Sequence, residues 1–218
     1  MEVNTVSISP ELFAGFFSFL LSGGRAECAG IVRRLLADEI GIRVLYTELF
    51  QPALYQVGEL WENNKISVAN EHLATSIVEG LLPLVYPRLF REEHCGKKAV
   101  VSCVVNEYHQ IGGKMVADIF ELNKWDSFFL GANTPMNDFF DFIEEKTPDA
   151  VGLSVSVFFN MGKLLCTIEE LRKKWAGLPI LVGGQAFRFG GGDLLREYPD
   201  VYLIDSLAGL ETFIRDQS

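Results

Sequence analysis

The chain has 218 residues, of which 49% are hydrophobic, and its formal net charge is −10. This length allows one large domain or two modest ones, and either can bury a core without disulfides. The 19 basic residues are dispersed along an acidic chain, which argues against direct nucleic-acid binding because phosphate contacts need clustered Lys and Arg. The hydrophobic runs are too short, and too often interrupted by charge, to span a membrane.

The N-terminus, Met1-Glu2-Val3-Asn4, has no basic segment, and the apolar stretch from Leu12 to Leu21 is not followed by a small-residue cleavage site. We therefore expect no signal peptide and a cytoplasmic protein. None of the cysteines forms a C-x-x-C pair; they are Cys28, Cys95, Cys103 and Cys166. We expect neither a zinc site nor a disulfide framework, and we interpret the cysteines as small core residues.

Residues 1–92 are expected to form an all-α four-helix bundle. Helices are predicted from Ser9 to Gly23-Gly24, over about 25–38 and 42–61, and from Ser67 onward. A capping serine followed by Pro10 is typical of a helix start, and a Gly pair is typical of a helix end. Pro83 and Pro87 predict a kink or an irregular end of the fourth helix. Short links between the four helices favour an up-and-down bundle.

Residues 93–218 alternate short apolar strands with helices, which is typical of a parallel sheet covered on both faces. Strands are predicted at 99–104, 127–130, 150–154, 180–182 and 201–204, and helices at 113–123, 136–146, 158–175, 191–198 and 209–216. This order predicts an α/β flavodoxin-like (Rossmann-like) doubly wound sheet of five parallel strands. Such sheets bind ligands beyond the carboxyl ends of their strands.

Glu107 and His109 lie in the loop after the first predicted strand, at that ligand-binding edge. A histidine two residues after a glutamate is typical of a metal ligand whose second ring nitrogen is oriented by the carboxylate. Gly112-Gly113 would let the backbone approach a bulky group closely. The alternative is a solvated loop histidine followed by glycines that only begin a helix.

Two further short patterns follow later strands at the same edge. Ser154-Val155-Ser156 places hydroxyl groups after the third strand, and Gly183-Gly184 leaves space after the fourth. Each pattern has a simpler explanation, because hydroxyls after a strand are usually helix caps and Gly-Gly is usually a turn.

The combination of these patterns resembles the cobalamin-binding domains of the base-off, His-on kind. The resemblance implies that His109 replaces the cofactor's own dimethylbenzimidazole as the lower axial ligand of cobalt and that Glu107 orients it. It also implies that Ser154 contacts the displaced nucleotide tail and that Gly183 and Gly184 form its channel. The remaining expected contacts are Gln110, Ile111, Gly112 and Ser156. These domains usually have Asp two residues before the histidine, and this chain has Glu107.

The helical half carries Trp61 and, after nine residues, Glu71-His72. Taken alone, Trp61 would be a helix-end core residue and His72 an exposed histidine in the first turn of a helix. Together with the Glu-x-His loop, the pair resembles the adenosylcobalamin photoreceptors of the CarH type. The resemblance implies that Trp61 packs on the adenosyl group, that Glu71 and His72 line the same pocket, and that His72 can ligate the upper cobalt position after illumination.

The function implied by this resemblance is a light sensor or signalling module, not an enzyme. It would hold adenosylcobalamin, or else methylcobalamin or hydroxocobalamin, and change conformation or oligomer state when light breaks the cobalt–carbon bond. The expected partner is a second copy or a separate signalling protein. Only eight residues precede the first predicted helix, so we expect no DNA-binding winged helix. Two alternatives remain: a corrinoid protein that carries methyl groups between methyltransferases, and a scaffold that has lost the cofactor.

Overall fold

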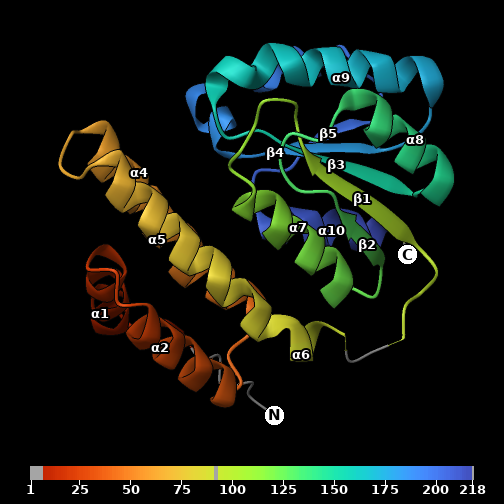
Figure 1. Ribbon diagram of the computed structural model, residues 1–218. Coiled ribbons are helices and arrows are strands. Elements are labelled where there is room, and N and C mark those ends of the chain that lie inside the picture. The colour runs from red at the N-terminus through yellow and green to blue at the C-terminus, as the bar shows by residue number, and fades with distance from the viewer. Residues whose placement is uncertain (1–6, 91–92, 218) are drawn as a thin grey trace. The chain divides into compact units, whose positions relative to one another are not determined.

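The computed structural model describes residues 7–90 and 93–217. The chain divides into two compact units, Met1–Arg91 and Glu92–Ser218 (Figure 1). The predicted boundary after residue 92 falls at residues 91–92, and the predicted leaderless start falls at residues 1–4; both lie outside the described residues. Within the described ranges, none of the helices is both long and apolar enough to cross a membrane.

The first unit is helical, as predicted. Its elements are α1 (Pro10–Leu21), α2 (Arg25–Ala37), α3 (Ile42–Val44), a π-helical segment (Leu45–Phe50), α4 (Gln51–Glu62), α5 (Val68–Leu81), a 3-10 turn (Leu82–Val85) and α6 (Tyr86–Leu89). Both predicted caps are present: the Ser9 hydroxyl accepts from the Leu12 N–H, and Ser67 forms a capping box with Asn70. The 3-10 turn around Pro83 is the predicted irregular end of the fourth helix.

The π-helical segment is a feature that the sequence pattern did not indicate. It comes immediately before Pro52, which has no N–H with which to continue an α-helical ladder. The segment turns four large side chains into the core of the unit: Leu45, Tyr46, Leu49 and Phe50. Phe50 contacts the rings of Phe16 and Tyr46 at centroid distances of 6.1 and 6.0 Å. This local irregularity therefore contributes four buried side chains to the helical core.

The second unit is a five-stranded parallel sheet in the order β2-β1-β3-β4-β5. The strands are β1 (Lys98–Cys103), β2 (Asp126–Phe129), β3 (Ala150–Ser154), β4 (Ile180–Gly183) and β5 (Val201–Leu203). Helices α7 (Ile111–Leu122) and α10 (Leu207–Asp216) cover one face, and α8 (Met136–Lys146) and α9 (Met161–Lys174) cover the other (Figure 1). The doubly wound fold predicted from the sequence is confirmed.

One helix predicted in this unit is absent, and another begins later than predicted. The helix predicted over 191–198 is only a 3-10 turn at Gly192–Leu195, because Gly190 and Gly191 have positive φ angles and interrupt any α-helical start. The helix predicted over 158–175 begins with a 3-10 turn at Phe158–Asn160, before α9.

The interpretation of the cysteines as core residues holds for only two of them. All four are free; Cys28 and Cys103 are buried, whereas Cys95 and Cys166 are exposed.

Candidate functional site

The loops after four strands meet at the carboxyl edge of the sheet. The Cys103 N–H donates to the Gly131 carbonyl (3.0 Å), the Val104 N–H to the Ser154 carbonyl (3.1 Å) and the Val155 N–H to the Gly183 carbonyl (2.9 Å). The loop after β1 lies at the point where the strand order reverses, between β1 and β3, which is where doubly wound sheets bind ligands. This loop carries Glu107 and His109.

Glu107 is the hydrogen-bonding centre of this edge. Its side chain is fully buried, and its Oε1 accepts from the His109 N–H (3.0 Å) and lies 2.5 Å from the His109 Nδ1. Its Oε2 accepts from the N–H groups of Ser156 (2.9 Å) and Val157 (3.0 Å) and from the Asn160 side-chain amide (3.2 Å). One carboxylate therefore joins the loop after β1 to the loop after β3.

The Glu107 carboxylate stays ionised despite its burial. Desolvation alone raises its pKa, but the hydrogen bonds from the His109 ring and from the N–H groups of Val157, His109 and Ser156 outweigh it and lower the pKa to about 2. A buried carboxylate with this many donors is a fixed negative charge directly behind the His109 ring.

His109 presents its ring outward from this support. The side chain is 57% exposed, although its Nδ1 faces Glu107. Its carbonyl lies 3.8 Å from the Cys103 Sγ, and burial raises the pKa of that thiol to about 12, so the thiol remains protonated at neutral pH. A carboxylate on Nδ1 fixes the ring orientation and raises the basicity of Nε2, which is the arrangement found behind metal-bound histidines.

The beginning of α7 needs glycine for steric reasons. A Cβ on Gly113 would lie 3.0 Å from the Phe129 ring and 3.4 Å from the Ser154 Cβ, and a Cβ on Gly112 would lie 4.0 Å from the Ser154 Oγ. Gln110 occupies the N-cap position of α7, and Ile111 is buried in its first turn. The predicted residues from 107 to 112 and Ser154 thus belong to one packed region.

The two glycines after β4 have a different environment from the open space that we expected. A Cβ on Gly183 would lie 2.8 Å from the Ile204 carbonyl oxygen, and one on Gly184, whose φ is +122°, would lie 2.1 Å from the Val155 carbonyl oxygen. Close backbone packing therefore accounts for both glycines. Their role as channel walls stays a prediction. Ser156 contributes its N–H to Glu107.

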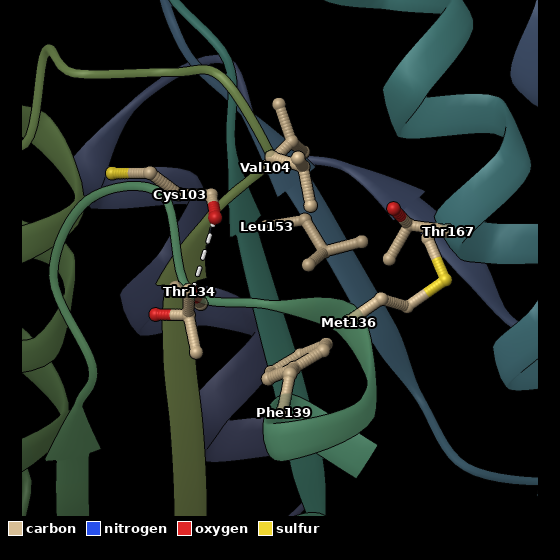
Figure 2. A pocket seen from close by; sticks show the side chains of 9 residues that line it. Cys103, Val104, Thr134, Met136, Phe139, Leu153 and Thr167 are labelled. Carbon is tan, nitrogen blue, oxygen red and sulfur yellow. Dashed lines mark hydrogen bonds between the residues drawn. The ribbon is translucent and has the colours of Figure 1, made fainter.

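A small pocket opens at the same edge, on the face of the sheet covered by α8 and α9. Figure 2 shows Val104, Leu153, Met136 and Phe139 around it, with Thr167 from α9 close by. Leu153 belongs to the core under α8 and α9, whereas the neighbouring Ser154 faces α7. The pocket and the predicted tail contact at Ser154 thus lie on opposite faces of the sheet.

The predicted residues of the helical unit lie on α4 and α5. Trp61, in the last turn of α4, is 46% exposed, so it is not the core residue of the simpler explanation. Glu71 accepts a hydrogen bond from the Thr75 hydroxyl (2.8 Å), and its Oε2 lies 3.5 Å from the Nε2 of His72, whose side chain is 75% exposed. An outward indole and an outward imidazole supported by a carboxylate are available for a ligand.

Exposed apolar side chains that no sequence motif indicated lie in the loop of His109 and in the loop joined to it through Glu107. Tyr108 precedes His109, and the loop that donates to Glu107 continues through Val157, Phe158 and Phe159; all four are exposed. Asn160, which ends this loop, also escaped prediction, although it bonds Glu107 and the Asn106 carbonyl. A buried Asn 53 residues from its partner leaves no local pattern that could have identified it.

Comparison with known proteins decides the family. The model of the B12 binding domain matches residues 97–208, and a second model with the same description matches residues 12–85. The chain belongs to the B12 binding domain family. Its cofactor is therefore cobalamin, as the Glu-x-His motif predicted, and the residues around His109 fit a corrinoid because they offer an oriented imidazole beside exposed apolar surface.

Two curated relatives of this B12-binding chain are HTH-type transcriptional repressors from Myxococcus xanthus. CarH is 32% identical over 146 residues, which cover 66% of this chain and 48% of CarH. CarA is 30% identical over 125 residues, which cover 57% of this chain and 43% of CarA. The chain spans about half the length of these relatives.

A solved structure shares the fold over nearly the whole chain. The monomethylamine corrinoid protein of Methanosarcina barkeri has a TM-score of 0.80 and is 14% identical, and the match covers 94% of this chain and 98% of that chain. At this level of identity the likeness concerns the fold.

Proposed function

We propose that this B12-binding chain is a light-responsive signalling module that holds adenosylcobalamin base-off, with His109 Nε2 as the lower cobalt ligand. The observation that carries the proposal is the pair formed by the buried, ionised Glu107 and the outward His109 ring. The curated relatives at 32% and 30% identity, both transcriptional repressors, support a regulatory role for the module.

The displaced nucleotide tail is proposed to lie against Ser154, on the face of the sheet covered by α7. Ser154 is buried beneath the start of α7, where Gly112 and Gly113 let the helix backbone approach it closely. The backbone N–H groups held by Glu107 keep the β3–α9 loop in place beside the corrin.

Trp61, Glu71 and His72 are proposed to contact the upper ligand. An adenosyl group is large and amphipathic, and an exposed indole with a carboxylate and an imidazole is suited to it. When bound, adenosylcobalamin supplies a cobalt–carbon bond that visible light breaks. Trp61 would hold the adenosyl group by packing, and His72 would be available to bind the cobalt once that group has left; the changed surface would then alter the oligomeric state or the binding of a signalling partner.

The test uses the full chain loaded with adenosylcobalamin in the dark. Absorption spectra and sedimentation are recorded before and after green light. We expect His109→Ala to lose the dark spectrum of histidine-ligated cobalt. His72→Ala is the matched control: it should keep the dark spectrum and change only that of the illuminated protein.

The methyl carrier is the alternative outcome of the same experiment. A carrier would keep its sedimentation coefficient on illumination, and with methylcobalamin it would pass the methyl group to an added methyltransferase and its acceptor. Wild-type spectra in the His109→Ala variant would contradict the proposal at its central contact.

A further inference from the structure

His94, the remaining histidine of the chain, lies outside both cobalamin motifs. It is at the start of the second unit, before β1. Its Nδ1 lies 2.5 Å from the Asp126 Oδ1 at the start of β2, and its Nε2 lies 3.1 Å from the Glu121 Oε2 in the last turn of α7. Each ring nitrogen therefore faces a different carboxylate.

This geometry favours the imidazolium form. A neutral imidazole has one N–H and one lone pair, so one of the two carboxylates would face a lone pair at short distance. Glu121 is largely buried, and no hydrogen bond from a described residue satisfies its Oε2 apart from the ion pair with His94. Loss of the second proton would leave that buried oxygen without compensation.

The surroundings of His94 are otherwise well ordered by backbone contacts. The Cys95 N–H donates to the Lys124 carbonyl (2.8 Å), and the Glu121 Oε1 accepts from the Ser127 N–H (2.8 Å). Among the described residues, the titratable groups that act on His94 are Asp126 from β2 and Glu121 from α7, and both raise the pKa of His94.

Glu121 connects His94 to the loop that carries His109, because Glu121 lies on the helix that follows this loop. Helix α7 begins two residues after His109 and carries Glu121 in its last turn. Twelve residues of α-helix form a rod about 18 Å long, so a displacement of the His109 loop moves the Glu121 end of α7 as well.

We propose that protonated His94, paired with Asp126 and Glu121, is a charged clasp between β2 and α7. Through α7 this clasp couples the His109 loop to the chain segment before β1, which enters from the helical unit. The coupling rests on the proposed role of His109 as the cobalt ligand; the clasp itself does not. Protonation of His94 favours one position of α7, and a corrinoid bound at His109 favours or opposes the same position. Linkage then requires that each changes the other.

The clasp is tested by NMR titration of the histidine side chains in the cofactor-free full chain, which has only three histidines. We expect His94 to titrate above the ordinary histidine value of about 6.5. Glu121→Gln and Asp126→Asn should each lower its midpoint by about one pH unit. Two variants from different elements guard against the misfolding of one. An unchanged His94 midpoint in both would overturn the clasp.

The coupling is tested by the same titration with hydroxocobalamin bound. The His94 midpoint should move, and at a fixed pH near 6 the affinity of His94→Gln for hydroxocobalamin should differ from wild type by about two- to thirtyfold. A His94 midpoint that is indifferent to bound hydroxocobalamin would overturn the coupling and leave the proposed function intact. A chain that binds no corrinoid would overturn the proposed function and the coupling together, while the cofactor-free midpoints still decide the clasp.

Discussion

Glu107 determines how the His109 ring is held. The Glu107 side chain allows one oxygen to serve His109 and the other to reach two backbone N–H groups and Asn160. Glu107 therefore places a negative charge behind the His109 ring and also joins it directly to the loop after β3.

Removing this charge should weaken corrinoid binding. Glu107→Gln keeps the size of the side chain but presents a neutral amide to the ring, and outer partners of metal-bound histidines typically contribute 10- to 100-fold in affinity. We expect a loss of about that size in titrations with hydroxocobalamin followed by absorbance. Glu169→Gln, at an exposed carboxylate on α9, is the control. Equal affinities of Glu107→Gln and wild type would show that the carboxylate does not support the ligand.

Glu107 should also govern acid stability of the cofactor-free chain. Its folded-state pKa of about 2 lies below the ordinary value of about 4.3, so its contribution is complete above pH 4.3 and is lost as the pH falls towards 2. The contribution is on the order of 3 kcal/mol. Urea unfolding at pH 2.5, 3.5 and 5 should show this dependence in wild type. Glu107→Gln should show a smaller one, and parallel curves would contradict the low pKa.

At the scale of elements, the packing at the start of α7 depends on the absence of a side chain at Gly113, next to the Phe129 ring. Gly113→Ala brings a methyl group within 3.0 Å of the Phe129 ring, and the resulting repacking costs about 1–3 kcal/mol. This outweighs a gain in helix propensity of up to about 1 kcal/mol. We expect a lower midpoint of urea unfolding.

The matched control for that change is Gly162→Ala on α9, where a Cβ meets nothing within 4 Å. Only the propensity term remains there, so this variant should be more stable than wild type by about 0.5–1 kcal/mol. Opposite signs for the two substitutions are the expected result. Stabilisation by both would mean that the space beside Phe129 is not restricted.

The regular elements could be predicted because their signals are local. Short apolar runs separated by helical patterns indicated all five strands, and Ser9 and Ser67 indicated two helix starts. The π-helical segment could not be predicted, because its hydrogen bonds depend on how Pro52 is accommodated within a continuous apolar pattern. The helix predicted over 191–198 does not form, because Gly190 and Gly191 adopt positive φ angles that an α-helix does not allow.

At the scale of the whole molecule, the pairing of Glu107 with His109 could be predicted from the motif, whereas their more distant partners could not. His109 and Glu107 are two residues apart, but Asn160 meets Glu107 across 53 residues and His94 meets Asp126 across 32. These pairs exist only once the sheet has brought separate loops together. The sequence motif predicts His109 as the ligand, and the fold supplies the groups that hold its ring.

The clasp at His94 should make stability fall as the pH rises. Because the pKa of His94 is raised in the folded chain, its contribution is complete below the ordinary value of about 6.5 and is lost as the pH passes the raised value. Urea midpoints of wild type and His94→Gln should therefore differ most near pH 6 and converge at higher pH. Glu93→Gln, next to it in sequence, should follow wild type. A constant offset between wild type and His94→Gln would contradict the prediction.

The exposed aromatic side chains of the His109 loop and of the loop joined to it affect the cellular level of the chain when cobalamin is scarce. Phe159 is 93% exposed, and Tyr108 and Phe158 are exposed as well. Exposed aromatic surface promotes aggregation. Cobalamin that binds tightly to the native state stabilises that state by mass action. The cellular level of the chain should therefore rise and fall with the supply of corrinoid. The amount of folded protein would then match the amount of cofactor available to it.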